Sequence, residues 1–292
     1  MAKAKKQTAP DLKTRVKSAV KRRLGVGGKQ DLTFKQALKE PPKRKLKLLD
    51  KLKIVETIDV PDSDLKFSVT SMTEFNRVTR MKEPWTAEWV QSLPEDSVLW
   101  DIGANIGLFS LLAAEQENVN FVVAIEPSSL NASAIWRNAG LNGLTGKIIL
   151  VPGGVGEETG MRFLNLQNTK PGGALHSFGD IIYAGGEKTP ETVHSEPSYL
   201  FRLDDLVRFD GMPFPTHLKI DIDGYEMTAL KGAPKLLADQ RLKAIQIEVM
   251  EPDGITALRD EVTGLITGYG FEFDEAIHHG SHSIATDLRF KR

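Results

Sequence analysis

Two hydrophobic periodicities alternate along the chain from residue 98 onward. Short apolar runs with the length of buried strands are separated by segments whose apolar residues recur every three or four positions, as on one face of a helix. We expect strands at 98–102, 121–126, 147–152, 217–222 and 243–249, and helices near 106–116, 129–141, 225–238 and 254–268. This alternation predicts an α/β fold with a mostly parallel sheet wound with helices.

Less regular segments flank this pattern. Further strands are expected at 54–60, 65–72, 271–277 and 282–290, and a further helix at 85–93. Residues 168–198 are interrupted by glycines and prolines and predict a long insertion loop. A loop of this length in a compact domain is usually functional, so it is a candidate lid over a substrate.

Charge divides the chain into two parts. Residues 1–53 hold 18 Lys+Arg and 4 Asp+Glu, a net charge of +14, whereas the remainder holds 20 and 35, a net charge of -15. We therefore expect a basic N-terminal arm over 1–53, partly helical or disordered, with a basic amphipathic helix at 11–24, and one catalytic domain over 54–292. The arm is interpreted first as a solvated tail or a contact for an acidic protein, then as a peripheral contact with an anionic membrane, and least as a nucleic-acid contact.

Composition narrows the classes of protein further. The chain has no cysteine, which excludes disulfides, thiolate zinc sites and a cysteine nucleophile. No apolar run approaches the ~20 residues of a membrane span. A cytoplasmic location is expected.

The run Asp101-Ile-Gly-Ala-Asn-Ile-Gly107 follows the first core strand and carries the main functional signal. Gly103, Ala104 and Gly107 predict a tight turn between a strand and a helix N-terminus, which is a cradle for an anionic or zwitterionic ligand. Asp101 can accept a hydrogen bond from an ammonium group, as S-adenosylmethionine (SAM) requires. Asn105 stands where a nicotinamide-binding turn would have its second glycine, and either contacts a ligand carboxylate or serves only the turn.

Two further segments extend this cofactor site. Glu126 ends the second strand, where an acid grips a ribose diol in wound sheets, although a first-turn acid also complements a helix dipole. Pro127 follows it and starts the next helix. Small residues at Gly153–Gly156, among them Gly154 and Val155, would let an adenine ring approach the backbone or simply form a turn.

Charged residues interrupt the fourth strand. Lys219, Asp221 and Asp223 alternate with isoleucines and are expected on one face, with Glu248 of the next strand as a partner. They form either a catalytic group, with Asp221 as the first candidate base, or an internal ion-pair network. His176, in the long loop, is a second kind of candidate base or a solvated side chain.

Three histidines near the end of the chain, His278, His279 and His282, resemble a metal cluster. Neighbouring residues on a strand point to opposite faces, so at most two of the three can converge. No metal is therefore assigned.

The runs Asp101–Gly107, Ile125-Glu-Pro127 and Leu218-Lys-Ile-Asp-Ile-Asp-Gly224 with Lys231-Gly-Ala233 resemble the FkbM-type SAM-dependent methyltransferases over residues 83–250. The resemblance implies a class I methyltransferase fold, which is a seven-stranded Rossmann-like sheet, and methylation of a hydroxyl oxygen on a sugar, glycan or natural product. It also implies that Glu83 matches an acid that family members often carry before the first core strand, and that Glu126 is the ribose acid.

Two other functions remain as alternatives. A nicotinamide-dependent oxidoreductase would need the second glycine that Asn105 replaces. An RNA methyltransferase or nucleic-acid-binding protein would use the basic arm, but no aromatic-rich basic stripe is visible. The expected partner is a small-molecule or glycan acceptor, and the sequence is silent on oligomeric state.

Overall fold

A computed structural model describes residues 55–81, 83–179, 191–251, 256–280 and 283–292 of the 292-residue chain. The chain divides into two units after Glu56. The basic arm, including the helix expected at 11–24, lies outside the described residues. Within the part that the structure describes, no helix combines the length and the apolar character that crossing a bilayer requires.

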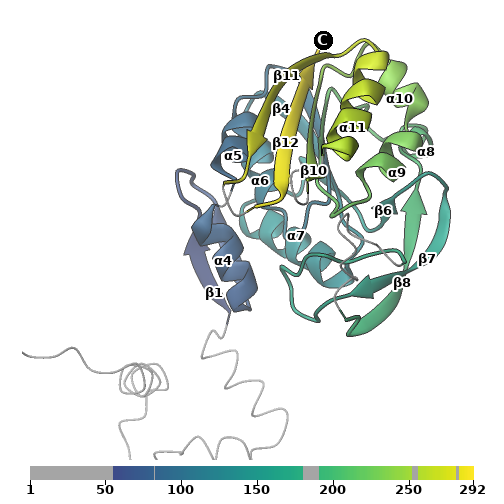
Figure 1. The fold of residues 1–292 in the computed structure, drawn as a ribbon. Helices are drawn as coiled ribbons and strands as arrows, with labels where there is room; N and C mark the ends of the chain where they lie inside the picture. Colours follow the sequence, from purple (N-terminus) through teal and green to yellow (C-terminus); the bar gives the residue numbers. More distant parts are fainter. Residues whose placement is uncertain (1–54, 82, 180–190, 252–255, 281–282) are drawn as a thin grey trace, which may run out of the picture. The chain divides into compact units, whose positions relative to one another are not determined.

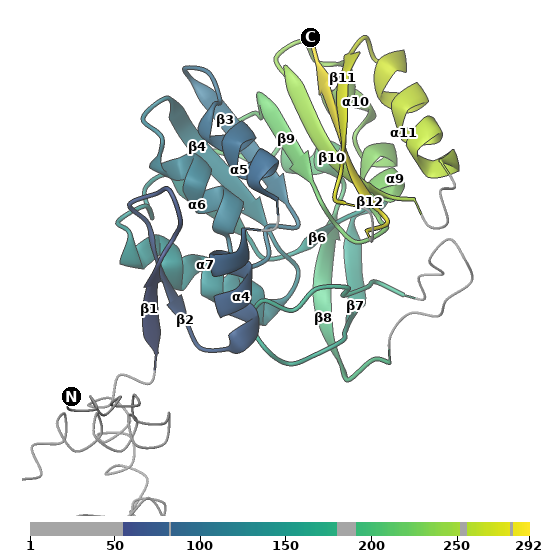
Figure 2. The same ribbon diagram turned by 60° about the vertical axis from the view of Figure 1, so that its left-hand side comes forward.

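A seven-stranded sheet forms the centre of the second unit, residues 57–292 (Figures 1 and 2). Its strands are β3 (Ser97–Ile102), β4 (Val119–Ile125), β5 (Ile148–Val151), β9 (His217–Ile220), β10 (Ala244–Met250), β11 (Glu272–His278) and β12 (Ala285–Lys291). The strand order is β11-β12-β10-β9-β3-β4-β5. β12 runs antiparallel to both of its neighbours, and the other pairs are parallel.

This order confirms the fold that the hydrophobic pattern and the resemblance predict. It is the Rossmann-like sheet of the class I methyltransferases, with the one reversed strand next to an edge. The chain runs outward from β3 in both directions, through β4 to β5 and through β9 to β10. The carboxyl ends of β3, β4 and β9 therefore border a crevice, where ligands bind in sheets of this kind.

Helices cover both faces of the sheet, as Figure 1 shows. α5 (Pro84–Gln91), α6 (Leu108–Glu115) and α7 (Ser129–Leu141) pack on one face, and α8 (Leu203–Leu206), α9 (Glu226–Lys231), α10 (Pro234–Ala238) and α11 (Ala257–Gly268) pack on the other. Successive side chains of β3 point to opposite faces of the sheet. Trp100 and Ile102 pack in the core beneath α8–α11, whereas Leu99 packs in the core beneath α5–α7. Asp101 therefore points toward α6.

The helix expected at 225–238 is two helices. Gly232 separates α9 from α10, and Pro234 opens the second helix. A Cβ on Gly232 would lie 2.1 Å from the carbonyl oxygen of Gly156. The break therefore brings the chain against the segment that follows β5.

Two small sheets accompany the main one. β6 (Gly154–Val155), β8 (His194–Phe201) and β7 (Gly160–Leu166) form the order β6-β8-β7, and β1 (Glu56–Asp59) pairs with β2 (Lys66–Val69). The prediction of one loop over 168–198 is therefore wrong at its end, because β8 begins at His194. Among the described strands, the part of β8 that contains Pro197 pairs with β7 alone, and a proline is tolerated on such an open edge.

The sequence prediction missed the four-residue α8 and a longer helix, α4 (Met72–Arg80). Ser71 caps it by accepting a hydrogen bond from the Glu74 backbone N–H, and the Glu74 carboxylate accepts one from the Ser71 N–H. Arg137 forms an ion pair with the fully buried Glu74 at 2.5 Å. The pattern Ser-x-x-Glu is the sequence signature of this capping box, so the helix start was visible in the sequence.

Candidate active site

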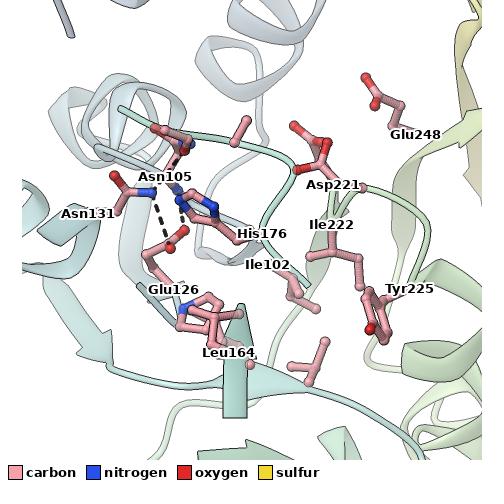
Figure 3. Close-up of a pocket in the computed structure, with 18 of the residues that line it drawn as sticks. Ile102, Asn105, Glu126, Asn131, Leu164, His176, Asp221, Ile222, Tyr225 and Glu248 are labelled. Carbon is pink, nitrogen blue, oxygen red and sulfur yellow. Dashed lines mark hydrogen bonds between the residues drawn. The ribbon is translucent and has the colours of Figure 1, made fainter. Parts of the chain in front are cut away.

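A cavity of about 760 Å³ opens at the carboxyl ends of β3, β4, β9 and β10. Figure 3 shows Glu126 and Asn131 at one side of this cavity and Asp221 and Glu248 at the other. The wall between them includes Gly103, and aromatic side chains close another part of it. The volume lies in the usual range for small-molecule and cofactor sites.

Gly103 holds the floor of the cavity in place. Its φ is +82°, and a Cβ at this position would lie 1.8 Å from the carbonyl oxygen of Asp221. Only glycine permits both this backbone conformation and this close approach. The end of β3 and the end of β9 are therefore joined directly beneath the site.

Asn105 and Glu126 are joined by a short hydrogen bond. The Asn105 backbone N–H donates to Oε2 of Glu126 at 2.8 Å, and Asn105 has a left-handed φ of 52°. Ser128 N–H and the Asn131 side chain donate to Oε1 of Glu126 at 2.9 and 3.3 Å. The carboxylate thus ties the glycine turn to the start of α7 while it lines the cavity.

Burial controls the charge of Glu126. Desolvation raises its pKa to about 7, although hydrogen bonds from Ser128, Asn105 and Asn131 lower it. An ionised carboxylate offers about four lone-pair sites, and three donors occupy only part of that capacity. Glu126 can therefore accept further hydrogen bonds from a ligand in the cavity.

The segment 171–175 closes over the glycine turn. Asn105 Nδ2 donates to the Gly173 carbonyl at 2.7 Å, and Asn131 Oδ1 accepts from the Gly172 N–H at 2.8 Å. At its far end, the Leu175 N–H donates to the Asp223 carboxylate at 2.7 Å. The first part of the expected lid is thus anchored across the cavity; residues 180–190 lie outside the described residues.

Several residues expected at the cofactor do not line the cavity. Asp101 is fully buried, accepts a hydrogen bond from Ser110 Oγ at 2.5 Å and lies 3.6 Å from Lys219 Nζ. The expected contact between Asp101 and a ligand ammonium is therefore not supported, because strand alternation turns the carboxylate under the sheet. Ala104 and Gly107 are also set back, and a Cβ on Gly107 would meet Leu111 and Ile135.

Of the other expected cofactor residues, Glu83, Pro127, Gly154 and Val155 line the cavity. A Cβ on Gly154 would lie 2.4 Å from the ring of Phe178. The small residue at 154 thus makes room for a side chain of the protein itself. Sequence reasoning missed Phe178, because a lone aromatic residue in a loop carries no motif.

Lys219 belongs to a buried ion-pair network. Its Nζ lies 3.0 Å from Asp221 and 3.6 Å from Asp101, and its side chain is only 3% exposed. Burial lowers the pKa of Lys219, but Asp221 and Asp101 outweigh this effect and raise it well above its usual value. Lys219 therefore stays charged beneath the cavity, and its side chain is not part of the cavity lining.

β9 ends at Ile220, so Asp223 lies beyond the strand. Contrary to the sequence prediction, it therefore does not share one strand face with Lys219 and Asp221. Asp223 has a φ of 52° and turns toward Leu175. Burial and the charge of Asp221 raise its pKa to about 6. Glu226 closes this turn by accepting hydrogen bonds from the Ile222 and Gly224 N–H groups.

Carboxyl groups crowd the second side of the cavity. Oxygen atoms of Glu83, Asp221 and Glu248 lie within 4.8 Å of one another. Burial and the charge of Asp221 raise the pKa of Glu83 to about 7 and that of Glu248 to about 10. Such crowding has to be relieved by protons or by positive charge.

Glu248 was expected to pair with Lys219, but among the described residues its ion-pair partner is His279. His279 Nδ1 lies 3.6 Å from Glu248, and His279 Nε2 lies 2.9 Å from Asp287. His278 is exposed, as strand alternation predicts, and His282 lies outside the described residues. Sequence reasoning weighed His279 only as a metal ligand and missed Asp287.

His176 lines the other part of the cavity. Its Nδ1 accepts a hydrogen bond from the Gln167 N–H at 3.3 Å, and burial lowers its pKa. The charges that act on it are those of Glu196 and Arg77. It is therefore separate from the carboxyl groups at Asp221 and Glu248.

A family model for the methyltransferase FkbM domain matches residues 101–273, which is more than half of the chain. The chain belongs to the FkbM methyltransferase family. The matched segment begins at Asp101 and contains the glycine turn, Glu126 and the end of β9. The protein is thus a methyltransferase, and the resemblance drawn from the sequence is confirmed.

Curated relatives agree with this assignment. The methyltransferase is 26% identical over 205 residues to the hexuronic acid methyltransferase AglP of Haloferax volcanii, covering 67% of this chain and 76% of that protein. It is 28% identical over 205 residues to the 31-O-demethyl-FK506 methyltransferase FkbM of Streptomyces tacrolimicus, covering 62% and 75%.

A solved structure is also similar. The crystal structure of a methyltransferase FkbM from Methylobacillus flagellatus KT matches with 17% identity and a TM-score of 0.47. The match covers 94% of this chain and 59% of that one, so the methyltransferase spans less than two thirds of its length.

SAM is the cofactor of the methyltransferase. The Glu126 carboxylate, with spare acceptor capacity at the end of β4, suits a ribose diol. Gly103, Asn105, Pro127 and Val155 form the adjoining wall. When bound, the cofactor supplies an electrophilic methyl group.

Proposed function

We propose that this protein transfers the methyl group of SAM to a hydroxyl oxygen of a sugar, glycan or natural-product acceptor. One observation carries the proposal: a single cavity joins Glu126 and the glycine turn to the carboxyl groups of Asp221 and Glu248. The first group suits the cofactor, and the second offers acceptors for the hydroxyl hydrogens of a polar substrate.

The relatives support this choice of acceptor. One is named as a hexuronic acid methyltransferase and another as a 31-O-demethyl-FK506 methyltransferase, a name that places the methyl group on an oxygen. A hexuronic acid carries hydroxyl oxygens, so a hydroxyl acceptor is compatible with both names. Methyl transfer to a hydroxyl requires that the acceptor be held close to the donor, and much of the rate comes from this positioning.

The chain's own residues divide this work. Glu126 and Asn105 hold and orient the cofactor. The segment 171–175 is fastened to Asn105, whose side chain donates a hydrogen bond to the Gly173 carbonyl, and in this position it shields the cofactor from solvent. Asp221 faces the cavity while Lys219 fixes its position from below. Glu83 borders the same space and restricts it to a polar acceptor.

The proposal is tested with SAM that carries a trideuterated methyl group. The panel contains a neutral hexose, a 6-deoxyhexose, a hexuronic acid and a macrolide alcohol, and mass spectrometry locates the label. We expect a labelled methyl ether on at least one acceptor, and about tenfold less or lower still with Glu126→Ala at a SAM concentration below the wild-type Kd. Label found only on the carboxylate of the hexuronic acid would overturn the proposed chemistry.

A further inference from the structure

His279 is held rigidly at the border of the cavity. It follows β11, lines the cavity, and packs against Trp85 in a tilted arrangement, with ring centroids 4.9 Å apart and an interplanar angle of 53°. Its Nε2 lies 2.9 Å from Oδ2 of Asp287, and the Trp85 indole N–H donates to the same oxygen at 2.6 Å. Two elements, α5 and β12, thus fix the position of one imidazole ring.

Asp287 decides which nitrogen of His279 carries the proton. Burial alone would raise the pKa of Asp287, but hydrogen bonds from His279 and Trp85 outweigh it, so the pKa lies below its usual value. An ionised carboxylate only accepts hydrogen bonds, and Nε2 must therefore be the protonated nitrogen. In neutral His279 the lone pair is then on Nδ1, which lies on the side of Glu248, a residue that also lines the cavity.

We propose that His279 is the general base of the reaction and that Asp287 is its positioning residue. This inference rests on the proposed function. As the oxygen of the acceptor forms its bond to the methyl carbon, the carbon–sulfur bond breaks. The hydroxyl proton moves to Nδ1 of His279 and later passes to solvent. The products are the methyl ether, S-adenosylhomocysteine and one proton.

The neighbouring carboxyl groups are less suited to this role. Asp221 is paired with Lys219 at 3.0 Å, so its carboxylate is already engaged by a buried cation. Glu248, with a pKa of about 10, already holds a proton at neutral pH. Glu83 has a suitable pKa of about 7, but within the described residues no hydrogen bond orients its carboxylate as Asp287 orients His279.

The charges around His279 set the pH at which it works. Burial lowers its pKa, but the hydrogen bond and charge of Asp287, followed by the charges of Glu83 and Asp221, outweigh burial, and Glu248 also faces it. The pKa of His279 therefore lies above the usual 6.5. Because the base must be neutral, turnover should rise with pH through a value above 6.5.

The test compares His279→Gln, Asp287→Asn and the matched control His278→Gln, whose side chain is exposed at the end of β11. With an acceptor from the panel, His279→Gln should lower kcat by about 10²- to 10⁴-fold, the usual range for a general base. Its affinity for SAM should stay within about twofold of wild type. His278→Gln should retain wild-type kcat, and imidazole should partly restore turnover to His279→Ala.

Two further readouts separate catalysis from structure. The acid limb of the pH profile should vanish in His279→Gln and move to lower pH in Asp287→Asn, because the loss of a negative charge lowers the pKa of His279. Without any acceptor, ¹⁵N NMR of the wild-type protein should show the Nε2–H tautomer of His279 at alkaline pH.

The inference is wrong if His279→Gln keeps its kcat and acid limb, or if NMR shows the Nδ1–H tautomer. It is also wrong if Glu83→Gln removes the acid limb while His279→Gln does not. Loss of turnover with EDTA and recovery with Mg²⁺ would assign the carboxyl groups to a cation and overturn it. Absence of ether methylation on every acceptor, with the Nε2–H tautomer present, would count against the proposed function instead.

Discussion

Asp101 and Lys219 occupy facing positions on β3 and β9, and their charged atoms lie 3.6 Å apart inside the protein. Both side chains are almost inaccessible to solvent, at 1% and 3% exposure. The pair supports the cavity from below, because Lys219 also holds Asp221 at the cavity wall. Asp101, which the sequence places in the cofactor motif, thus influences the cavity indirectly, through Lys219 and its ion pair with Asp221.

Lys219→Met should lower the free energy of unfolding by about 3–5 kcal/mol, because it leaves Asp101 buried without a cation. Adding Asp101→Asn should recover more than half of this loss. Denaturant titration measures both variants, with the exposed Lys231→Met as the control. A loss below about 1 kcal/mol in Lys219→Met would show that the network is not structural.

Gly103→Ala should destabilise the protein by more than about 3 kcal/mol, because a left-handed backbone strain adds to a clash with the Asp221 carbonyl. Gly140→Ala is the matched control. Gly140 lies in α7 with nothing within 4 Å of a new Cβ, so alanine there should be neutral or stabilising by up to about 1 kcal/mol. Equal melting temperatures for the two variants would contradict this account of the turn.

The free energy of unfolding of the ligand-free protein should fall as the pH rises from about 4.5 to about 7. Burial raises the pKa values of Glu83, Glu126 and Glu226 to about 7, so the folded state retains protons that the unfolded chain releases. Their stabilising contribution is complete below pH 4.5 and is lost as the pH passes 7. Urea denaturation between pH 5 and pH 8.5 measures the slope.

Glu226→Gln isolates one of these groups. Glu226 is buried behind the cavity, so the neutral isostere should flatten the pH slope and raise stability at pH 8 by about 1–3 kcal/mol. Glu261→Gln, exposed on α11, should leave the curve unchanged. A steeper slope in Glu226→Gln would reverse the sign assigned here.

The sequence predicts the wound sheet and the position of its binding edge because both depend on local signals. The glycine turn at Gly103 and the acid at Glu126 follow strands whose apolar runs are unmistakable. These signals place the two residues at adjacent strand ends without any knowledge of the strand register. They line the same cavity.

The remainder of the site depends on contacts between distant strands. The Asp101–Lys219 pair requires the register of β3 against β9, and the His279–Asp287 pair requires the reversed strand β12 beside β10 and β11. No periodicity in a single sequence encodes that register. Asp101 was interpreted as a cofactor residue because it precedes the glycine turn, whereas alternation along β3 directs its side chain inward, toward Ser110 of α6.

Calorimetric titration of the full chain with SAM, S-adenosylhomocysteine and NAD tests the central claim most directly. The account predicts that the first two bind and NAD does not. Glu126→Ala should weaken SAM binding by about 1.5–3 kcal/mol, and the exposed Glu117→Ala should not. Binding of NAD as tight as that of SAM, or unchanged SAM affinity in Glu126→Ala, would contradict the account.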